Sequence, residues 1–130
     1  MDKNFNVEII SPNTTFFKSE AIEVIIPSYE GQMGILQDHI SLITFLRPGL
    51  IIVKKNNEKI SFFIEDGIVE FSDNNLLILS ATIKSLNKLD KNFIETAIKD
   101  SQEKFNNSEI TDKEKYLLSH KIETLNEINR

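Results

Sequence analysis

Hydrophobic and polar residues alternate along roughly the first two thirds of the chain. From Phe5 to about Thr82 the period is close to two, and breaks rich in Pro, Gly, Asn and Asp interrupt it often. Short strands at this spacing are typical of an antiparallel β-sandwich or flattened barrel, so we expect about eight to ten strands. The run Leu76 to Leu79 is apolar throughout and predicts a strand buried on both faces.

After the strands, the hydrophobic period becomes that of a helix. Asp90 is placed to cap a helix that ends near Phe105, and Thr111-Asp112-Lys113-Glu114 has the form of a capping box that opens a second helix. Their short connection predicts antiparallel neighbours. We therefore predict a β-sandwich domain over residues 1–85 and an α-helical hairpin over residues 86–130. The apolar stripe of this hairpin must pack either on the sandwich or on another protein.

The segment from Pro27 to Gly49 contains three of the four glycines in the chain. Gly31 and Gly34 indicate a tight corner between strands, because glycine is favoured where φ is positive or where backbones approach closely. The apolar residues that follow this corner predict a structured, largely buried crossover, which Arg47-Pro48-Gly49 closes as a turn.

Composition excludes several classes of function. The 130 residues carry a net charge of −5, which disfavours binding to a phosphate backbone. The absence of cysteine excludes disulfides, thiol catalysis and cysteine-based zinc sites. The start of the chain does not have the pattern of a secretory signal or transit peptide, and no apolar run approaches the length of a membrane span. We therefore expect any membrane role to come through a partner.

The candidate chemistry is sparse. His39 follows Asp38, which resembles a base with an orienting carboxylate, but neighbouring residues on a strand point to opposite faces. We expect a structural or interface role for His39, and a solvated position on the second helix for His120. These are the two histidines of the chain, and without cysteine they make a poor metal site. We predict no catalytic residue, no metal and no cofactor.

The chain resembles one known protein family. The stretch EGQMGILQDHISLITFLRPG is similar to a motif of the epsilon subunit of bacterial F-type ATP synthases, the counterpart of the mitochondrial delta subunit. The resemblance extends to VEIISPN near the start, to the segment from Glu65 to Glu70, and to the two helices after the sandwich. It therefore covers essentially the whole chain.

The resemblance implies a non-catalytic rotor subunit in the central stalk of the proton-translocating enzyme, which couples rotation of the membrane c-ring to the catalytic head. Its implied partners are the gamma subunit, the c-ring and, through the hairpin, the alpha and beta subunits. The implied location is the cytoplasmic side of the bacterial inner membrane. The ring-contacting corner of the family corresponds to Tyr29, Glu30, Gly31 and Gln32, and His39 lies in the same motif.

In this family the hairpin can regulate ATP hydrolysis, and in some members it binds ATP. The nucleotide motif is degenerate here: Asp90 is retained, but Phe93 occupies the arginine position and Ile94 the alanine position. Phenylalanine offers no donor to a phosphate, so we expect weak or no ATP binding. Acidic and basic residues are interleaved on the second helix. Their charges partly cancel, which weakens the attraction of this helix to an acidic segment of a catalytic subunit. We therefore expect a hairpin that stays folded, with coupling as the main role of the protein.

Two other classes of function remain open from the sequence. The first is a β-sandwich ligand-binding module, for sugar or peptide, with a helical dimerisation tail. It would be expected to carry exposed aromatic residues around a groove, whereas the chain has no Trp and two Tyr. The second is a small metal-free hydrolase, which would require His39 close to a serine and a carboxylate in a cleft.

Overall fold

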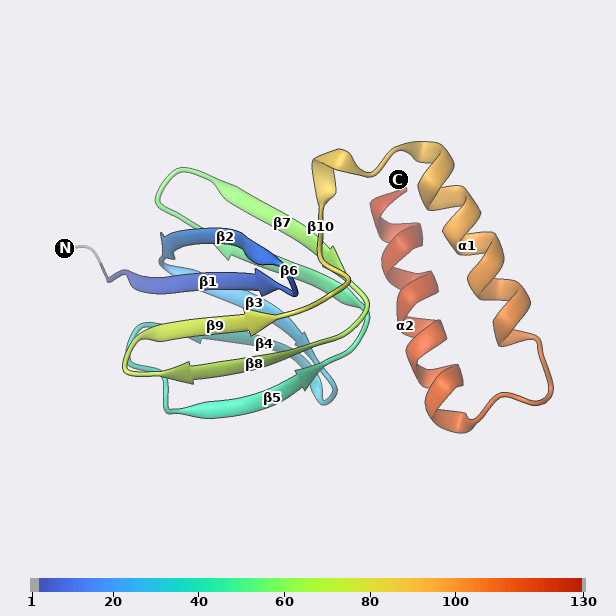
Figure 1. Ribbon diagram of the computed structural model, residues 1–130, viewed down its shortest axis with the longest axis horizontal. Coiled ribbons are helices and arrows are strands. Elements are labelled where there is room, and N and C mark those ends of the chain that lie inside the picture. Colours follow the sequence, from blue (N-terminus) through green and yellow to red (C-terminus); the bar gives the residue numbers. More distant parts are fainter. Residues whose placement is uncertain (1–2, 130) are drawn as a thin grey trace.

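The computed structural model describes residues 3–129 and contains a curled β-sheet followed by two helices (Figure 1). A short 3-10 helix, Leu86–Lys88, links the sheet to α1 (Lys91–Phe105) and α2 (Asp112–Ile128). The strands are β1 (Phe5–Ser11), β2 (Thr14–Ala21), β3 (Glu23–Ser28), β4 (Gly31–Leu36), β5 (Leu42–Leu46), β6 (Gly49–Lys54), β7 (Lys59–Ile64), β8 (Gly67–Ser72), β9 (Asn75–Leu79) and β10 (Lys84–Ser85).

The strands form two facing layers, as the alternating pattern predicts. Their order is β10-β7-β6-β3-β5-β8-β9-β1-β2, with β4 paired to β3. The pairs are antiparallel except β1 with β9, which are parallel. The predicted fold class, an antiparallel sandwich followed by a helical hairpin, is confirmed. The division into domains at residue 85 stays a prediction.

The inward-facing side chains of the two layers form one hydrophobic core. Phe5 and Phe71 meet edge to face, with ring centroids 5.7 Å apart. Burial of these apolar side chains is the main driving force for the fold. The remaining fully buried members of this core include Val7, Ile9, Val24, Ile26, Ile35, Leu46, Ile51, Ile64, Val69, Leu76 and Ile78.

The prediction that β9 is buried on both faces was wrong. Leu76 and Ile78 are buried, but Leu79 is exposed, because no layer formed by residues 3–129 covers the outer face of β9. The doubly buried run is found on β7 instead. There Phe62 belongs to the sandwich core, whereas Phe63 points the other way and is covered by the helical hairpin.

The prediction of a largely buried crossover was also wrong. Ile43 is 69% exposed and Phe45 is 61% exposed, because β5 turns one face to the core and the other to solvent; Ile40, just before β5, is exposed as well. The corner itself is a two-residue turn at Tyr29 and Glu30, which Gly31 closes with a φ of 129°. Gly34 lies inside β4 rather than at the corner.

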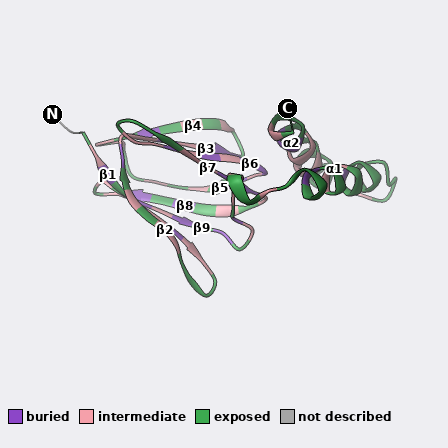
Figure 2. Ribbon diagram, turned by 90° about the horizontal axis from the view of Figure 1, so that it is seen from above, coloured by how far each residue is buried: buried purple, intermediate pink, exposed green. Residues whose placement is uncertain are grey.

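Both helices begin where the capping signals predict. The Asp90 carboxylate accepts a hydrogen bond from the Phe93 amide at 2.7 Å, and Thr111 forms a capping box with Glu114. The hairpin lies against one end of the sandwich, with α2 nearer to it than α1 (Figure 2). The cluster that joins the two parts, here called the hairpin cluster, has Phe63, Ile94 and Leu125 at its centre, with Leu50, Leu86, Leu89, Ala97, Ile98 and Ile128 around them.

Candidate interaction surfaces

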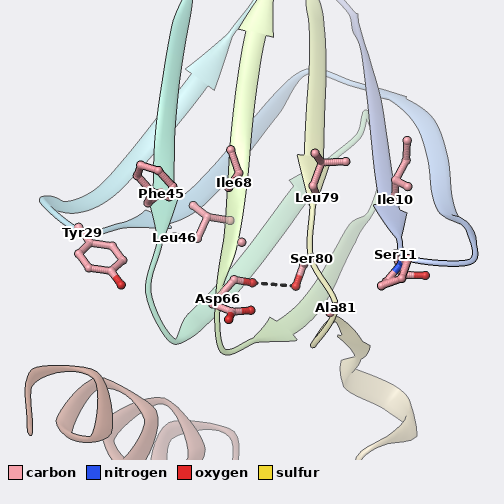
Figure 3. Close-up of a pocket in the computed structure, with 12 residues that line it drawn as sticks. Ile10, Ser11, Tyr29, Phe45, Leu46, Asp66, Ile68, Leu79, Ser80 and Ala81 are labelled. Atoms are coloured by element: carbon pink, nitrogen blue, oxygen red, sulfur yellow. Dashed lines mark hydrogen bonds between the residues drawn. The ribbon is translucent and has the colours of Figure 1, made fainter. Parts of the chain in front are cut away.

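An exposed apolar row crosses four neighbouring strands on the outer face of the sandwich. The register pairs Phe45 with Ile68, Ile68 with Leu79, and places Ile10 opposite Leu79. Cross-strand neighbours lie on the same face of a sheet, so these four side chains stand side by side, as Figure 3 shows. Phe45, Ile68 and Leu79 are all exposed, and Ile10 is half-buried. We call these four residues the apolar row.

An open hollow of about 550 Å³ lies along the apolar row, at the strand ends that face the hairpin (Figure 3). Some of the polar groups that line this hollow or lie beside it are hydrogen-bonded within the chain. The Ser80 hydroxyl donates to the Asp66 carbonyl at 2.7 Å, and the Thr82 hydroxyl accepts from the Glu65 amide at 3.0 Å. What this hollow offers to a partner is therefore mainly apolar contact.

The next row of the same face mixes apolar and charged side chains. Ile43 and Leu77 alternate across the strands with Glu70, Glu8 and Lys18. An apolar centre bordered by polar and charged residues is the usual composition of a protein–protein interface. Exposed apolar residues gathered on one sheet face favour a docking surface over a substrate cleft.

The turn between β3 and β4 brings four of the predicted interface residues together. Tyr29, Glu30 and Gln32 are exposed, and Gly31 is half-buried between them. The turn is held from inside by the Ser28 hydroxyl, which donates to the Gly31 carbonyl at 2.6 Å. We call residues 29–32 the corner. Its exposure is compatible with the predicted contact to a partner, which stays a prediction.

His39, the fifth predicted interface residue, is not part of the corner. It follows the opposite end of β4, where its ring packs edge-on against Phe71 at 5.9 Å. The sequence pattern placed Asp38 and His39 on one strand. Asp38 instead adopts a φ of 66° in a turn, so the two residues do not share a strand. The Asp38 carboxylate accepts from the Asn74 amide at 3.0 Å, whereas the His39 Nδ1 lies 2.7 Å from the Ile40 carbonyl oxygen. These contacts give His39 and Asp38 separate structural roles.

The degenerate nucleotide motif is occupied by structural contacts. The Asp90 carboxylate caps α1, and the ring of Phe93 is exposed at the arginine position of the family motif. The Lys84 ammonium lies 5.7 Å from the centre of that ring. At these two positions the structure has a capping carboxylate and an apolar ring, neither of which supplies a hydrogen-bond donor for a phosphate.

Polar contacts from α2 fasten the hairpin to the sandwich beside the hairpin cluster. Lys121 forms an ion pair with Glu65 at 2.8 Å. The hydroxyl of Tyr116 donates to the carbonyl of Tyr29 at 2.5 Å. Tyr116 was not singled out from the sequence, because its position on the helix gave no sign of a partner 87 residues away.

His120 is half-buried rather than fully solvated, so that prediction was wrong. Its ring lies edge-on to Tyr116, with centroids 4.6 Å apart. Burial, together with the positive charge of Arg47, lowers the pKa of His120 below its usual value, and the negative charge of Glu123 opposes this shift. The neutral imidazole is therefore favoured when the hairpin lies on the sandwich.

Within residues 3–129, no helix combines the length and the apolar composition that crossing a bilayer requires. The same residues contain no group of three or more metal-ligating side chains close enough to hold an ion.

Together the fold and its surfaces define a β-sandwich docking module with a helical hairpin folded against one end. The family model described as ATP synthase, delta/epsilon chain, β-sandwich domain matches residues 4–85. The chain belongs to the ATP synthase delta/epsilon family.

Full-length relatives agree with this assignment. The chain is 42% identical over 130 residues to the ATP synthase epsilon chain of Pelagibacter ubique (strain HTCC1062), an alignment that covers 99% of this chain and 100% of the relative. It is 31% identical over 124 residues to the ATP synthase epsilon chain of Cyanothece sp. (strain PCC 7425 / ATCC 29141), covering 95% of this chain and 87% of that one. Both alignments include helical residues that the family model leaves out.

Solved structures share the fold at low identity. A chain in the cryo-EM structure of the Euglena gracilis mitochondrial ATP synthase, OSCP/F1/c-ring, matches with a TM-score of 0.82 at 16% identity, covering 100% of this chain and 84% of that chain. A chain in the central stalk/c-ring structure of the Tetrahymena thermophila mitochondrial ATP synthase matches with a TM-score of 0.64 at 14% identity, covering 96% of each.

Proposed function

We propose that this protein is a non-catalytic rotor subunit of an ATP synthase, which links the gamma subunit to the membrane c-ring and transmits rotation between the ring and the catalytic head. The names of its relatives support the assignment to the complex. The similar chain from Tetrahymena belongs to a structure of the central stalk and c-ring. A close-packed sandwich is suited to this task, because it deforms little under load.

The observation that carries this proposal is the apolar row. Phe45, Ile68 and Leu79 remain exposed in the isolated chain although they belong to well-packed strands. Burying such side chains against a partner contributes about 25 cal/mol for each Å² removed from water. We assign the row as the centre of the gamma-binding surface, with Glu70, Glu8 and Lys18 on its rim.

The test is the affinity of the purified chain for the gamma subunit, measured with one substitution inside the row and one outside. Phe45→Asp places a charge at the centre of the proposed interface, and we expect a loss of about 30-fold or more in affinity, the size typical of a hot-spot residue. Phe93→Asp changes an aromatic residue that is also exposed, in the first turn of α1 where an acid is tolerated.

We expect Phe93→Asp to bind gamma as the unmodified chain does. Circular dichroism and thermal unfolding of both variants establish that each is folded. Equal affinity of the Phe45→Asp variant and the unmodified chain would remove the apolar row from the gamma interface.

The corner is proposed to contact the polar loops of the c-ring. Its support is the exposure of Tyr29, Glu30 and Gln32 on a short turn that is braced on both sides. The carboxylate of Glu30 provides a negative charge for a basic loop. This arrangement would keep the subunit peripheral, on the cytoplasmic side of a bacterial inner membrane, attached through its partners.

We further propose that the hairpin stays folded and that coupling is the main role of the protein. The buried Leu125 and the Lys121–Glu65 ion pair support this conformation. They also count against the alternative of a ligand-binding module with a helical dimerisation tail, because the apolar stripe of the hairpin is used within the chain. The positions of Asp90 and Phe93 support the proposal that ATP binding is weak or absent.

A further inference from the structure

The corner has one brace that comes from outside the sandwich. The Tyr116 hydroxyl of α2 donates to the Tyr29 carbonyl at 2.5 Å, and the two aromatic rings lie 6.0 Å apart. The other hydrogen bonds that hold this turn come from the sandwich itself, from the Ser28 hydroxyl to the Gly31 carbonyl and from the Tyr29 amide to the Phe45 carbonyl. The corner is therefore held in part by α2.

The first turn of α2 also lies next to the corner. Lys113 lines the same hollow of about 330 Å³ as Tyr29, Glu30, Thr44 and Phe45. The hollow thus presents a carboxylate from the corner and an ammonium from α2, and Phe45, which it shares with the apolar row, places it next to the surface assigned to gamma. If the hairpin left the sandwich, the ammonium and the Tyr116 brace would leave with it.

We propose that the corner and the first turn of α2 form one composite docking surface for a polar loop of the c-ring, and that this surface is complete only while the hairpin is folded. The inference rests on the proposed function. A loop that carries a basic side chain for Glu30 and a carboxylate or carbonyl group for Lys113 fits the charges on the two sides of the hollow.

The composite surface couples ring binding to the position of the hairpin. A partner that contacts both elements binds the folded form more tightly than a form in which the hairpin has left the sandwich. By thermodynamic linkage, ring binding then stabilises the folded hairpin by the same factor by which the folded hairpin strengthens ring binding. The brace adds to this coupling, because a turn that is already ordered loses less conformational entropy when it binds.

The experiment uses the full-length chain in complex with gamma, and a purified c-ring in detergent as the probe. The natural chain has no cysteine, so a pair of spin labels can be placed at Lys59 on β7 and Lys104 on α1, both exposed. The distance between the labels reports the fraction of folded hairpin, and surface-immobilised rings report the affinity. Tyr116→Phe removes one hydroxyl and keeps the ring. Ser119→Ala, on the same helix, removes a hydroxyl that bonds only within α2 and serves as the control.

We expect Tyr116→Phe to weaken ring binding about three- to tenfold, the effect of one lost hydrogen bond, with affinity for gamma unchanged. The labels of the unmodified chain should show the folded distance with and without added ring, whereas in Tyr116→Phe, whose hairpin is held less tightly, added ring should shift the labels toward the folded distance. Lys113→Ala should weaken ring binding while the labels of the free chain keep their folded distance. Ser119→Ala should change none of these values.

Ring affinities of Tyr116→Phe and Lys113→Ala equal to that of the unmodified chain would overturn the composite surface while leaving the rotor function intact. A failure of the proposed function has a different signature. In that case the unmodified chain with gamma does not bind the ring at all, and the inference falls with the function on which it rests.

Discussion

The substitution Leu125→Ala tests whether the hairpin is held to the sandwich as a separate unit. Leu125 is fully buried in the hairpin cluster, where Phe63 from β7 and Ile94 from α1 meet it. Replacing a buried leucine by alanine costs about 2 to 5 kcal/mol, because it loses transfer free energy and leaves a cavity. None of the residues that surround Leu125 belongs to the sandwich core, so we expect the loss to fall on docking of the hairpin.

Native-state hydrogen exchange measures this loss for each segment. A cost of about 2 to 5 kcal/mol corresponds to an increase of roughly 30-fold to a few thousand-fold in the opening equilibrium of α1 and α2, with the exchange of β8 and β9 little changed. Leu76→Ala is the matched control, since Leu76 is equally buried but lies in the sandwich core. It should weaken protection throughout the chain. If Leu125→Ala lowered the protection of the strands as much as that of the helices, the reasoning would be refuted.

Three further predictions concern single sites. The pKa of His120 is lowered when the hairpin is docked, so the undocked state takes up protons first and docking weakens as the pH falls below about 6.5. The distance between spin labels at Lys59 and Lys104 should report this loss of docking, and His120→Gln should abolish the pH dependence. Asp90→Ala should cost about 1 kcal/mol through loss of the helix cap, visible in thermal unfolding, while calorimetry with ATP should give no saturable heat for either chain. Gly49→Ala should lower stability by about 1 to 3 kcal/mol in urea unfolding, because the added Cβ would lie 2.5 Å from the Pro27 Cβ; an unchanged midpoint would contradict the tight packing seen there.

The hydrophobic pattern and the capping signals were sufficient to predict the elements. Alternation with a period of two indicates strands whatever their partners are, because successive side chains of a strand point to opposite faces. Asp90 and Thr111 marked the helix starts because the polar groups that cap a helix lie within three residues of each other. The resemblance of the corner motif to the epsilon subunit then indicated the family.

The errors about β5 and β9 came from inferring burial from hydrophobicity. The apolar residues of β5 and β9 suggested strands buried inside the molecule, whereas Phe45 and Leu79 are exposed on the outer face. Sequence reports that a side chain is apolar, but not whether the chain itself or a partner covers it. The apolar row could have been suspected from β5, which is apolar on both of its faces, although the alignment of four strands depends on their register.

The sequence by itself determined the local elements, the caps and the family, since each of these depends on residues close together in the chain or on a contiguous motif. The tertiary structure alone decided which apolar face stays uncovered, that His39 lies away from the corner, and that Tyr116 of α2 braces Tyr29 of the β3–β4 turn. These features depend on contacts between residues far apart in the chain, and the positions of such residues are set by the register of the strands and the packing of the hairpin.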